Sequence, residues 1–400
     1  MTARPERAKL RRFRAEKDCA RPAGKRARWV GVSPSGSRWG MSLEDLRREI
    51  DEIDGRLVEG MNERAKRAVE IGRLKREAGQ NAAYAPERER EVLERVLAAN
   101  KGPLTETTLR AIWKELMSGS LALEMPAKVV YLGPEGSFSH LAALEKFGRS
   151  VDLAAVRDIA SVFDAVARGR ADYGLVPVEN TTGGAVRDTM ESFLGAQGPV
   201  KICAEMAMPV HQNLLGKETD PAKIKKVYSK PQVFDQCRGW LSQNLPHADL
   251  VAADSTSEAA LLATKIGGTA AIASGMAAEL YDLKVVAEAI EDNPQNQTRF
   301  LVLGRESPKP TGRDKTCLLF STAHKAGALV EVLEVLRRHG INMTKIESHP
   351  APEKSWEYYF FVDIEGHRDD EHVRKALQEA KPHTRELRVL GSFPVAVSAG

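Results

Sequence analysis

Apolar residues recur at helical spacing in the first third of the chain. From Leu43 to Leu57, five of them are separated by three, four, three and four residues, and the pattern continues to about Ala78. This period places them along one side of a single helix of over 35 residues. The apolar side of such a long helix needs a large partner surface to bury it.

Two shorter helices are predicted after the long one. The first follows Pro86 and ends at Ala99, and the second runs from about Thr105 to Glu124. Residues 41–126 therefore form an all-helical domain. Because this domain is too small to bury its long helix alone, we expect an intertwined helical dimer.

The pattern changes at Pro126 to strands that alternate with helices. An apolar strand, a turn and a helix occupy residues 128–148, and the same order recurs at 171–194 and 248–264. Alternation of this kind predicts an α/β domain with a largely parallel sheet, over residues 127–307.

Small or hydroxylated residues stand where each of these helices begins. They are Ser137, Ser139, Thr181 to Gly184, and Ser255, Thr256 and Ser257. Helix N-termini attract anions, although each group is equally well explained as an ordinary helix cap. Three such termini in one domain suggest a site for a small carboxylate between the two lobes of a periplasmic-binding-protein-like fold.

A Pro-, Gly- and charge-rich linker at 304–315 precedes the last domain, residues 314–400. Strands are expected at 316–322, 341–348, 356–364 and 386–393, with helices at 326–338 and 369–381. The order βαββαβ is that of a ferredoxin-like α+β unit. The chain as a whole is therefore expected to be multidomain.

The charge of the chain is concentrated at its N-terminus. Residues 1–40 hold twelve Lys and Arg against three acidic residues, so this segment carries +9 and leaves −5 for the remainder of a chain of net charge +4. Such a run of charge is compatible with a nucleic-acid arm or with a transit-like segment. Because a helix-capping sequence begins at Ser42, directly after Met41, we expect residues 1–40 to be disordered or to lie upstream of the natural start. No nucleic-acid partner is expected.

The spacing of the cysteines and histidines and the length of the apolar runs argue against several classes of site. The four cysteines form no CxxC pair, the nine histidines are dispersed, and no run approaches 18 apolar residues. We expect no metal, no organic cofactor, no membrane span and a cytoplasmic location.

Four cations in the helical domain are candidates for an anion site. Arg64 and Lys75 are eleven residues apart, which is three helical turns plus about 20°, so both project from nearly the same line. Arg47 points elsewhere on its own helix but is suited to a pocket of the other chain in an antiparallel dimer. Arg88 follows on the second helix. Any one of them is also compatible with a solvated basic surface.

The sequences LRREIDEIDGRLVEGMNERAKRAVEIGRLK and YAPERERE resemble the all-helical chorismate mutases over about 41–125. The resemblance implies that Arg47 of the partner joins Arg64, Lys75 and Arg88 to bind a dicarboxylate. It also implies that the third helix contributes Ser120 and Glu124. Ala85 stands where the family has an acidic residue, which puts one contact to a substrate hydroxyl in doubt.

The mutase reaction suits these residue types. A Claisen rearrangement needs a site that holds the compact conformer of a dianion and stabilises charge on the ether oxygen. Lys75 and Glu124 would share that oxygen. Because an ionised Glu124 repels it, mutase activity is expected to fall as pH rises.

The motifs GPEGSFSH, GLVPVENTTGGAV and NQTRFLVLG together resemble prephenate dehydratase over about 127–305. The resemblance implies that Thr298 assists departure of the ring hydroxyl, and that Glu179 and Asn180 act beside it. Arg299 is suited either to hold a carboxylate or to fix the loop. The proton for the leaving group comes from Thr298 or, relayed, from Glu179 or water.

Further dehydratase contacts are implied at the cleft. They are Ser137, Ser139, Thr181, Ser255, Thr256 and Phe300, with Gln232 and Gln236 as weaker matches. Lys230 departs from the histidine that is usual at its position.

The segments GALVEVLEVLRRHGINMTKIESHP and WEYYFFVDIEGH resemble the ACT domain that follows such dehydratases. The implied effector is L-phenylalanine, bound across a domain interface by Gly327, Ala328, Leu329, Val330, Asn342, Glu347 and Ser348. His349 replaces the usual arginine, which leaves the strength of inhibition open and suggests that it depends on pH. A purely structural ACT dimer is the alternative.

From residue 41 on, the chain resembles the bifunctional chorismate mutase–prephenate dehydratases. The resemblance implies conversion of chorismate to prephenate and of prephenate to phenylpyruvate, with feedback by L-phenylalanine, in a homodimer or a larger tetramer. One alternative is a dehydratase whose helical domain only dimerises, and Ala85 is its support. The other is a non-enzymic amino-acid sensor, against which Thr298 and Arg299 argue.

Overall fold

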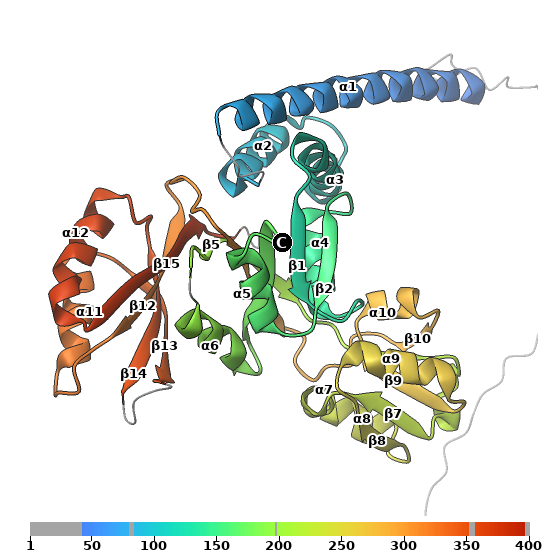
Figure 1. The fold of residues 1–400 in the computed structure, drawn as a ribbon. Helices are drawn as coiled ribbons and strands as arrows, with labels where there is room; N and C mark the ends of the chain where they lie inside the picture. The colour runs from blue at the N-terminus through green and yellow to red at the C-terminus, as the bar shows by residue number, and fades with distance from the viewer. Residues whose placement is uncertain (1–41, 80–83, 197, 352–356, 397–400) are drawn as a thin grey trace, which may run out of the picture. The chain divides into compact units, whose positions relative to one another are not determined.

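The computed structural model describes residues 42–79, 84–196, 198–351 and 357–396 (Figure 1). They fall into two units, one ending at Leu57 and one beginning at Val58. The predicted basic leader lies outside the described residues. The predicted cap is confirmed, because Ser42 Oγ accepts from the Asp45 amide at 3.1 Å while Asp45 Oδ2 accepts from the Ser42 amide at 3.0 Å.

The three predicted helices are present as α1 (Leu43–Glu77), α2 (Pro86–Ala99) and α3 (Glu106–Glu124). The apolar residues from Leu43 to Leu57 are exposed, between 44% and 59%. Beyond Val58, the helix has a tight contact at Gly72. An added Cβ there would stand less than 3.0 Å from the Glu124 carbonyl oxygen, so the absence of a side chain lets α1 lie directly against the end of α3.

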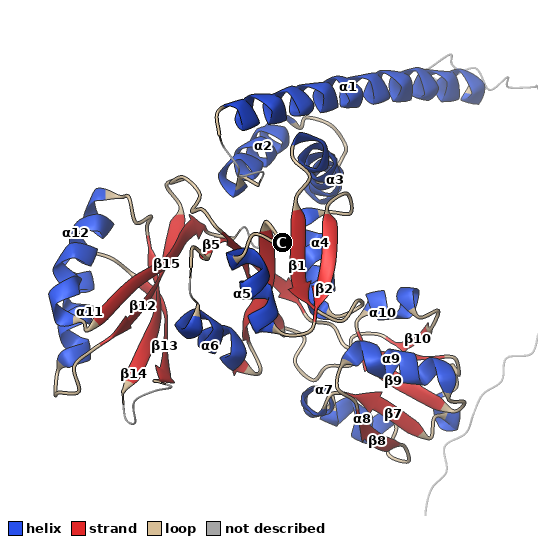
Figure 2. Ribbon diagram, viewed as in Figure 1, coloured by secondary structure: helices blue, strands red, loops and turns tan. Residues whose placement is uncertain are grey.

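The α/β part has two lobes, each built on its own sheet, and Figure 2 shows the strands flanked by helices. The first sheet has the order β2-β1-β3-β11-β5, with the short β4 (Gly184–Ala185) paired to β3. Its strands are β1 (Lys128–Leu132), β2 (Asp152–Val156), β3 (Tyr173–Asn180), β5 (Lys201–Pro209) and β11 (Gln297–Gly304). Its helices are α4 (Phe138–Phe147), α5 (Ile159–Ala167) and α6 (Arg187–Gly195).

The second sheet has the order β10-β6-β9-β7-β8. Its strands are β6 (Asn213–Gly216), β7 (Lys226–Ser229), β8 (Asp249–Ala252), β9 (Thr269–Ala273) and β10 (Lys284–Ala287). Its helices are α7 (Pro231–Gln236), α8 (Arg238–Asn244), α9 (Thr256–Lys265) and α10 (Gly275–Leu280).

The prediction of a largely parallel sheet was wrong, because both sheets are mixed. In the first, β1 is parallel to β2 and β3, but β11 is antiparallel to β3 and β5. The reason lies in the path of the chain. It leaves the first lobe after β5, builds the second lobe, and returns as β11 between β3 and β5, which places Thr298 in the centre of the first sheet.

The C-terminal domain has the predicted βαββαβ order and a four-stranded antiparallel sheet, β13-β14-β12-β15. Its elements are β12 (Asp314–Ser321), α11 (Ala328–Arg338), β13 (Met343–Pro350), β14 (Tyr358–Glu365), α12 (Glu371–Ala380) and β15 (Glu386–Pro394). The fold class predicted from the sequence, an all-α domain, a two-lobed α/β domain and a ferredoxin-like domain, is thus confirmed.

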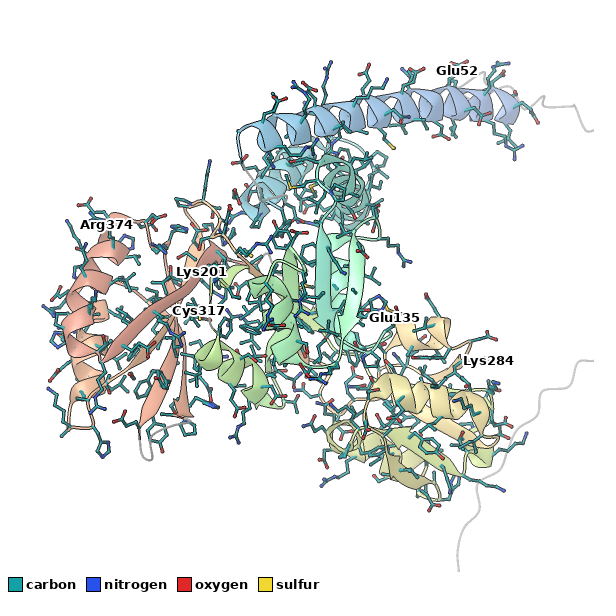
Figure 3. All side chains as sticks on the ribbon, in the orientation of Figure 1. Glu52, Glu135, Lys201, Lys284, Cys317 and Arg374 are labelled. Carbon is teal, nitrogen blue, oxygen red and sulfur yellow. The ribbon has the colours of Figure 1, made fainter. Side chains whose placement is uncertain are left out.

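Both faces of the C-terminal sheet are covered. Val332, Leu336 and Val373 of the two helices pack on one face. On the other, Leu319, Phe361 and Phe393 join a hydrophobic core with residues of the first lobe that include Phe193, Ile202 and Leu301. The two domains therefore share one apolar core. Lys201 at the start of β5 and Cys317 on β12 are both labelled in Figure 3, and Lys201 Nζ donates to the Val389 carbonyl oxygen at 3.0 Å.

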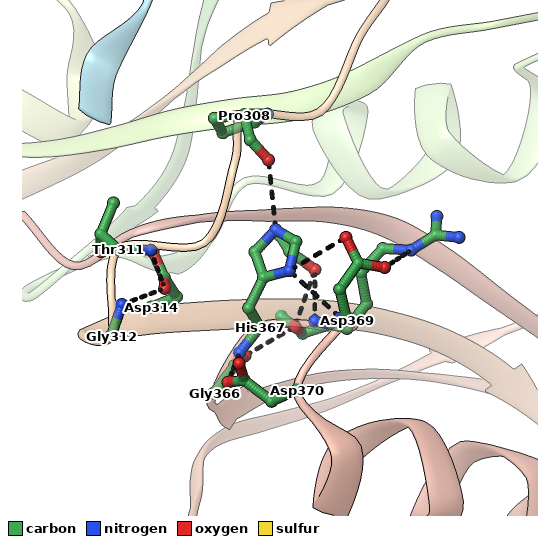
Figure 4. A network of polar contacts seen from close by, with 11 residues as sticks. Pro308, Thr311, Gly312, Asp314, Gly366, His367, Asp369 and Asp370 are labelled. Carbon is green, nitrogen blue, oxygen red and sulfur yellow. Dashed lines mark hydrogen bonds and ion pairs between the residues drawn. The ribbon is translucent and has the colours of Figure 1, made fainter. Parts of the chain in front are cut away.

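The linker between these domains is held by hydrogen bonds (Figure 4). His367 is 1% exposed; its Nε2 donates to the Pro308 carbonyl oxygen at 3.2 Å, while its Nδ1 accepts from the Asp369 amide at 3.1 Å. Asp314 Oδ2 accepts from the amides of Thr311 and Gly312 at 2.7 and 3.1 Å. The linker therefore fixes where the C-terminal sheet begins.

Close packing of β15 on β5 predicts the effect of one added methyl group. A Cβ at Gly391 would stand less than 3.0 Å from the Ile202 backbone, so Gly391→Ala is expected to cost about 1–3 kcal/mol and to lower the Tm by several degrees. Calorimetry on the purified chain measures this. Gly267→Ala, where no atom lies within 4 Å of the added Cβ, is the control, and an equal Tm for both variants would contradict the prediction.

Candidate functional site

Helices α1 and α3 bring together four of the residues predicted for the helical site. Arg64 Nη1 donates to Ser120 Oγ and, at 3.2 Å, to the Leu116 carbonyl oxygen. Lys75 Nζ lies 2.6 Å from Glu124 Oε1, and both side chains are largely buried. Helices α1 and α3 thus form two separate polar pairs, Arg64 with Ser120 and Lys75 with Glu124.

The remaining candidates of this site are not joined to these pairs. Arg88 is 58% exposed and pairs with Glu91 at 2.9 Å. Arg47 belongs to the unit that ends at Leu57, and its contribution to a partner chain stays a prediction. Ala85 is the N-cap of α2 and makes no side-chain cap bond.

Tyr84 anchors the start of α2 on the first lobe, a contact that sequence reasoning missed. Its amide donates to the Tyr173 hydroxyl at 2.9 Å, and its ring lies 5.3 Å from that of Phe147. Burial raises the pKa of Tyr84 well above its ordinary value. The aromatic residue before the Ala-Pro pair was the available signal.

In the first lobe, Thr298 and Asn180 face each other as cross-strand neighbours on β11 and β3. Asn180 Nδ2 donates to Thr298 Oγ1 and to Asn296 Oδ1, each at 2.9 Å. Asn180 Oδ1 accepts from the amides of Thr182 and Gly183 at 3.0 and 2.9 Å, which fixes the orientation of its amide group. Because Thr298 accepts from Asn180, its own hydroxyl hydrogen is left to donate to a further oxygen.

Asn296 is a second residue that sequence reasoning missed. It is 1% exposed, its Oδ1 also accepts from Thr182 Oγ1 at 3.2 Å, and its Nδ2 has no partner among the described residues. Its backbone oxygen accepts from Val210 at 2.8 Å, where the chain crosses between the lobes. Its position two residues before Thr298 was the signal.

The turn before α4 in the first lobe lies against the N-termini of two helices of the second lobe, α9 and α10, and Ser274 is the N-cap of α10. Ser274 Oγ donates to the Gly136 carbonyl oxygen at 2.8 Å, and a Cβ at Gly136 would lie 3.4 Å from Ser257 Oγ. Ser137 and Ser255 are the caps, accepting from His140 and Glu258 at 3.3 and 3.0 Å. The predicted caps are confirmed at the starts of α4 and α9, and the anion site stays a prediction. The remaining predicted helix start, at Thr181 to Gly184, was wrong: these residues form the turn that leads into β4 and the first residue of β4, and α6 begins later, at Arg187, without a side-chain cap.

The other predicted dehydratase residues have varied surroundings. Ser139 and Thr256 are buried, whereas Gln232 and Thr181 are exposed. Gln236 Oε1 accepts from Gln212 Nε2 at 3.2 Å. Phe300 is 1% exposed and packs in the core, so the structure gives its ring a packing role in place of the predicted substrate contact.

Arg299 is held by two carboxylates. Its guanidinium lies 2.7 Å from Glu205 Oε2 on β5 and 2.6 Å from Asp363 Oδ2 on β14 of the C-terminal sheet. Glu205 also accepts from Lys315 Nζ at 3.0 Å and from the Ala396 amide at 3.1 Å. Of the two roles predicted for Arg299, this geometry favours fixing the structure over holding a substrate carboxylate.

Glu179, the cross-strand neighbour of Arg299, is bound in the same way. Lys345 Nζ of β13 donates to Glu179 Oε2 at 2.8 Å. We call Arg299, Glu179, Glu205, Asp363, Lys315 and Lys345 the interdomain ion cluster. Sequence reasoning missed four of its members, although Glu205 and Asp363 each interrupt an apolar strand, which was the available signal.

A cavity of about 220 Å³ lies in the C-terminal domain. Of the predicted effector residues, Gly327, Ala328, Leu329 and Val330 line it, together with Tyr358 and Phe360 of β14. The structure does not bring the other three to this cavity.

Those three lie on or next to the edge strand β13. Glu347 and Ser348 are cross-strand neighbours of Phe361 and Phe360, and Asn342 Nδ2 donates to Glu365 at 3.1 Å. His349 Nε2 lies 3.8 Å from Glu191 of α6, so this position faces the first lobe.

Two classes of site are not found among the described residues. No group of three or more His, Cys, Asp or Glu side chains is arranged to hold a metal ion there. No helix within the described ranges is long and apolar enough to cross a membrane.

Three family models match successive parts of the chain. They are chorismate mutase type II over residues 46–125, prephenate dehydratase over residues 129–308 and the ACT domain over residues 318–381. Their order along the sequence is that of the three regions described above.

Relatives match nearly the whole chain. The bifunctional chorismate mutase/prephenate dehydratase of Aquifex aeolicus is 45% identical over 359 residues, which cover 89% of this chain and 98% of that protein. The protein of the same description from Stutzerimonas stutzeri is 42% identical, with the same coverage. Among solved structures, prephenate dehydratase from Arthrobacter aurescens in complex with L-Phe has a TM-score of 0.63 at 30% identity, covering 67% of this chain and 90% of that one.

The surroundings of Glu205 predict how stability changes with pH. Burial alone would raise the pKa of Glu205, but Arg299 and Lys315 outweigh it and hold the pKa below its ordinary value. The ionised form therefore stabilises the fold above the unfolded pKa of about 4.3, and this contribution is lost as the pH falls through the folded pKa. Glu205→Gln is expected to cost about 3–5 kcal/mol at neutral pH and to flatten the decline of stability in acid.

Urea unfolding of both proteins from pH 7 to pH 3 measures this. Glu218→Gln, which removes a more exposed carboxylate with a looser contact to Lys223 at 3.9 Å, is the control. Parallel pH curves for the parent and Glu205→Gln would contradict the prediction.

Proposed function

This chain belongs to the family of bifunctional chorismate mutase/prephenate dehydratases, and from this premise we propose that it catalyses both reactions. The helical domain rearranges chorismate to prephenate, and the two-lobed domain converts prephenate to phenylpyruvate. The observation that carries the proposal is that one chain holds both a pair of cations set against Ser120 and Glu124 and a fixed hydroxyl at Thr298.

The mutase step relies on position and charge. Arg64 and Lys75 supply the positive field for a dianion, and they do so at fixed points because Ser120 and Glu124 orient them. With substrate bound, Lys75, which Glu124 orients, donates to the ether oxygen as the C–O bond breaks. Arg88 and the partner's copy of the first-helix arginine complete the dicarboxylate contacts.

The dehydratase step requires departure of the ring hydroxyl as the carboxylate leaves as CO2. The electron pair of the breaking C–C bond enters the ring, which becomes aromatic, and the C–O bond breaks with its pair on oxygen. Thr298 donates a hydrogen bond to that oxygen because Asn180 already occupies its acceptor side. The proton that completes water reaches the oxygen through Thr298 or from a water molecule. Glu179, the other predicted source, is paired with Lys345 of the C-terminal domain; it precedes Asn180, the neighbour of Thr298, and projects from the opposite face of the sheet.

The cavity beside Gly327 suits a small amino acid, and we assign it to L-phenylalanine as feedback inhibitor. Its lining combines an apolar part, Leu329, Val330 and Phe360, with the start of helix α11, whose N-terminus favours a carboxylate. A second copy of the chain would add Asn342, Glu347 and Ser348.

The exposed apolar side of α1 supports a homodimer as part of the proposal. Five residues of one helical period, from Leu43 to Leu57, are exposed, and a second α1 in antiparallel orientation would cover them. The same pairing brings Arg47 to the other chain. A tetramer through the C-terminal sheets and a cytoplasmic location complete this proposal.

Ala85 favours one alternative, a dehydratase whose helical domain only dimerises. Purified protein given chorismate alone decides between them when chorismate, prephenate and phenylpyruvate are followed together over time. Phenylpyruvate formed from chorismate supports both activities. Turnover of added prephenate but not of chorismate supports the alternative, and no turnover of either rejects both readings.

Thr298 is expected to be essential for the second reaction only. Thr298→Ala removes the donor to the leaving oxygen and should lower kcat for prephenate by about 10²–10³-fold, while Thr298→Ser retains most of it. Coupled assays of phenylpyruvate formation measure this, and mutase activity of the same variants is the control. A Thr298→Ala rate within twofold of the parent would reject the assignment.

Glu124 is expected to matter for the first reaction through its contact with Lys75. Glu124→Ala removes the carboxylate that lies 2.6 Å from Lys75 Nζ and should lower the mutase kcat by about 10–100-fold, because the ammonium group is no longer held in place. Stopped chorismate assays measure this, with the dehydratase rate of each sample as control. A mutase rate within twofold of the parent would contradict the assignment.

A further inference from the structure

The interdomain ion cluster joins the two domains immediately next to the Thr298–Asn180 pair. Thr298 and Asn180 are cross-strand neighbours on β11 and β3, and the next pair along the same strands is Arg299 and Glu179. Successive residues of a strand project to opposite faces. The sheet thus presents its catalytic pair on one face and its charged pair on the face toward the C-terminal domain.

The C-terminal sheet carries a second pair of opposite charges that contacts the first pair. Lys345 and Asp363 are cross-strand neighbours on β13 and β14. Asp363 binds Arg299 and Lys345 binds Glu179, at 2.6 and 2.8 Å. Two neighbouring strands of one sheet are therefore held to two neighbouring strands of the other by a crossed set of opposite charges.

Because the Arg299–Asp363 pair is largely buried, it favours one relative position of the two sheets. Asp363 and Arg299 side chains are 5% and 17% exposed, and Val178, Phe193, Leu301 and Phe361 lie around them. An ion that loses its partner in such surroundings is costly, by far more than the net gain from forming the pair. If β14 is displaced, Arg299 therefore either moves together with Asp363 or leaves the buried Asp363 carboxylate without this partner.

Strand β14 also reaches the cavity assigned to the amino acid. Tyr358 and Phe360 line that cavity, and Asp363 follows three residues later, roughly 10 Å along a strand. Ser348 and Lys345 stand opposite this stretch on β13. A ligand that moves the start of β14 thus acts on a stiff element whose other end holds Arg299.

We propose that Asp363 and Lys345 are positioning residues for the dehydratase reaction, and that an L-amino acid in the Gly327 cavity changes turnover at Thr298 through their contacts with Arg299 and Glu179. The inference rests on the dehydratase activity and effector assigned above. It adds the residues through which the regulatory domain acts.

Two variants of the full-length chain test the inference, each with a matched control. Asp363→Asn keeps the shape of the side chain and removes its charge, and Glu334→Gln does the same at an exposed 2.6 Å ion pair on α11. Lys345→Met is matched by Lys375→Met on α12, where the lysine pairs with Glu371 at the surface. Mutase activity and calorimetric binding of L-phenylalanine show that each variant is folded and that its cavity still binds.

The decisive quantity is the ratio of dehydratase kcat without and with saturating L-phenylalanine. We expect Asp363→Asn and Lys345→Met to bind L-phenylalanine as the parent does but to be inhibited less. Their ratio should be smaller than that of the parent by about fivefold or more, while both controls should have the ratio of the parent. If either variant binds the amino acid and is inhibited as strongly as the parent, the inference is overturned.

Amide hydrogen exchange provides a readout that does not depend on the effector. Residues 176–181 and 296–301 should exchange faster in Asp363→Asn than in the parent, with Glu334→Gln unchanged. Equal exchange in all three proteins overturns the positioning role. A parent without prephenate turnover, or without inhibition, rejects the corresponding part of the proposed function, and the exchange result then decides the inference alone.

Discussion

Compensation of the Arg299 charge is the constraint on which the arrangement of the C-terminal half depends. A guanidinium on the central strand of the first sheet needs carboxylates, and the structure supplies one from the neighbouring strand, Glu205, and one from another domain, Asp363. Because two carboxylates face one guanidinium, a further cation is needed, and Lys315 supplies it by pairing with Glu205. Apolar contacts would allow the two sheets many relative positions, whereas this set of charges is satisfied in one.

The order and type of the elements could be predicted from the sequence because local patterns determine them. The three helices, the strand-turn-helix repeats and the βαββαβ order all follow from the periods of apolar residues. Sheet order could not be predicted, since pairing of β11 between β3 and β5 depends on contacts between residues that are 88 to 129 positions apart in the sequence. The period of apolar residues therefore did not predict that β11 returns antiparallel to its neighbours.

The candidate sites divide in the same way. Arg64, Lys75, Ser120 and Glu124 could be predicted, since helical geometry fixes the spacing of the cations and family motifs supply the rest. The partners of Arg299 could not, because nothing in the local sequence connects residue 299 with residue 363. A charged residue inside an apolar strand, as at Glu205 and Asp363, indicates only that a partner exists. Phe300 shows the opposite error, in which membership of a motif was taken for contact with substrate.

The crossed charges also restrict how this chain could exchange parts with its relatives. A C-terminal domain taken from another family member would need an acid opposite Arg299 and a cation opposite Glu179, each on the correct one of two adjacent strands. A domain with the same fold but without these two charges would leave Arg299 with Glu205 as its one acidic partner and would leave Glu179 without its lysine. The two-lobed domain and the C-terminal domain of this chain are thus matched to each other at four positions, and substitutions at these positions are expected to co-vary across the family.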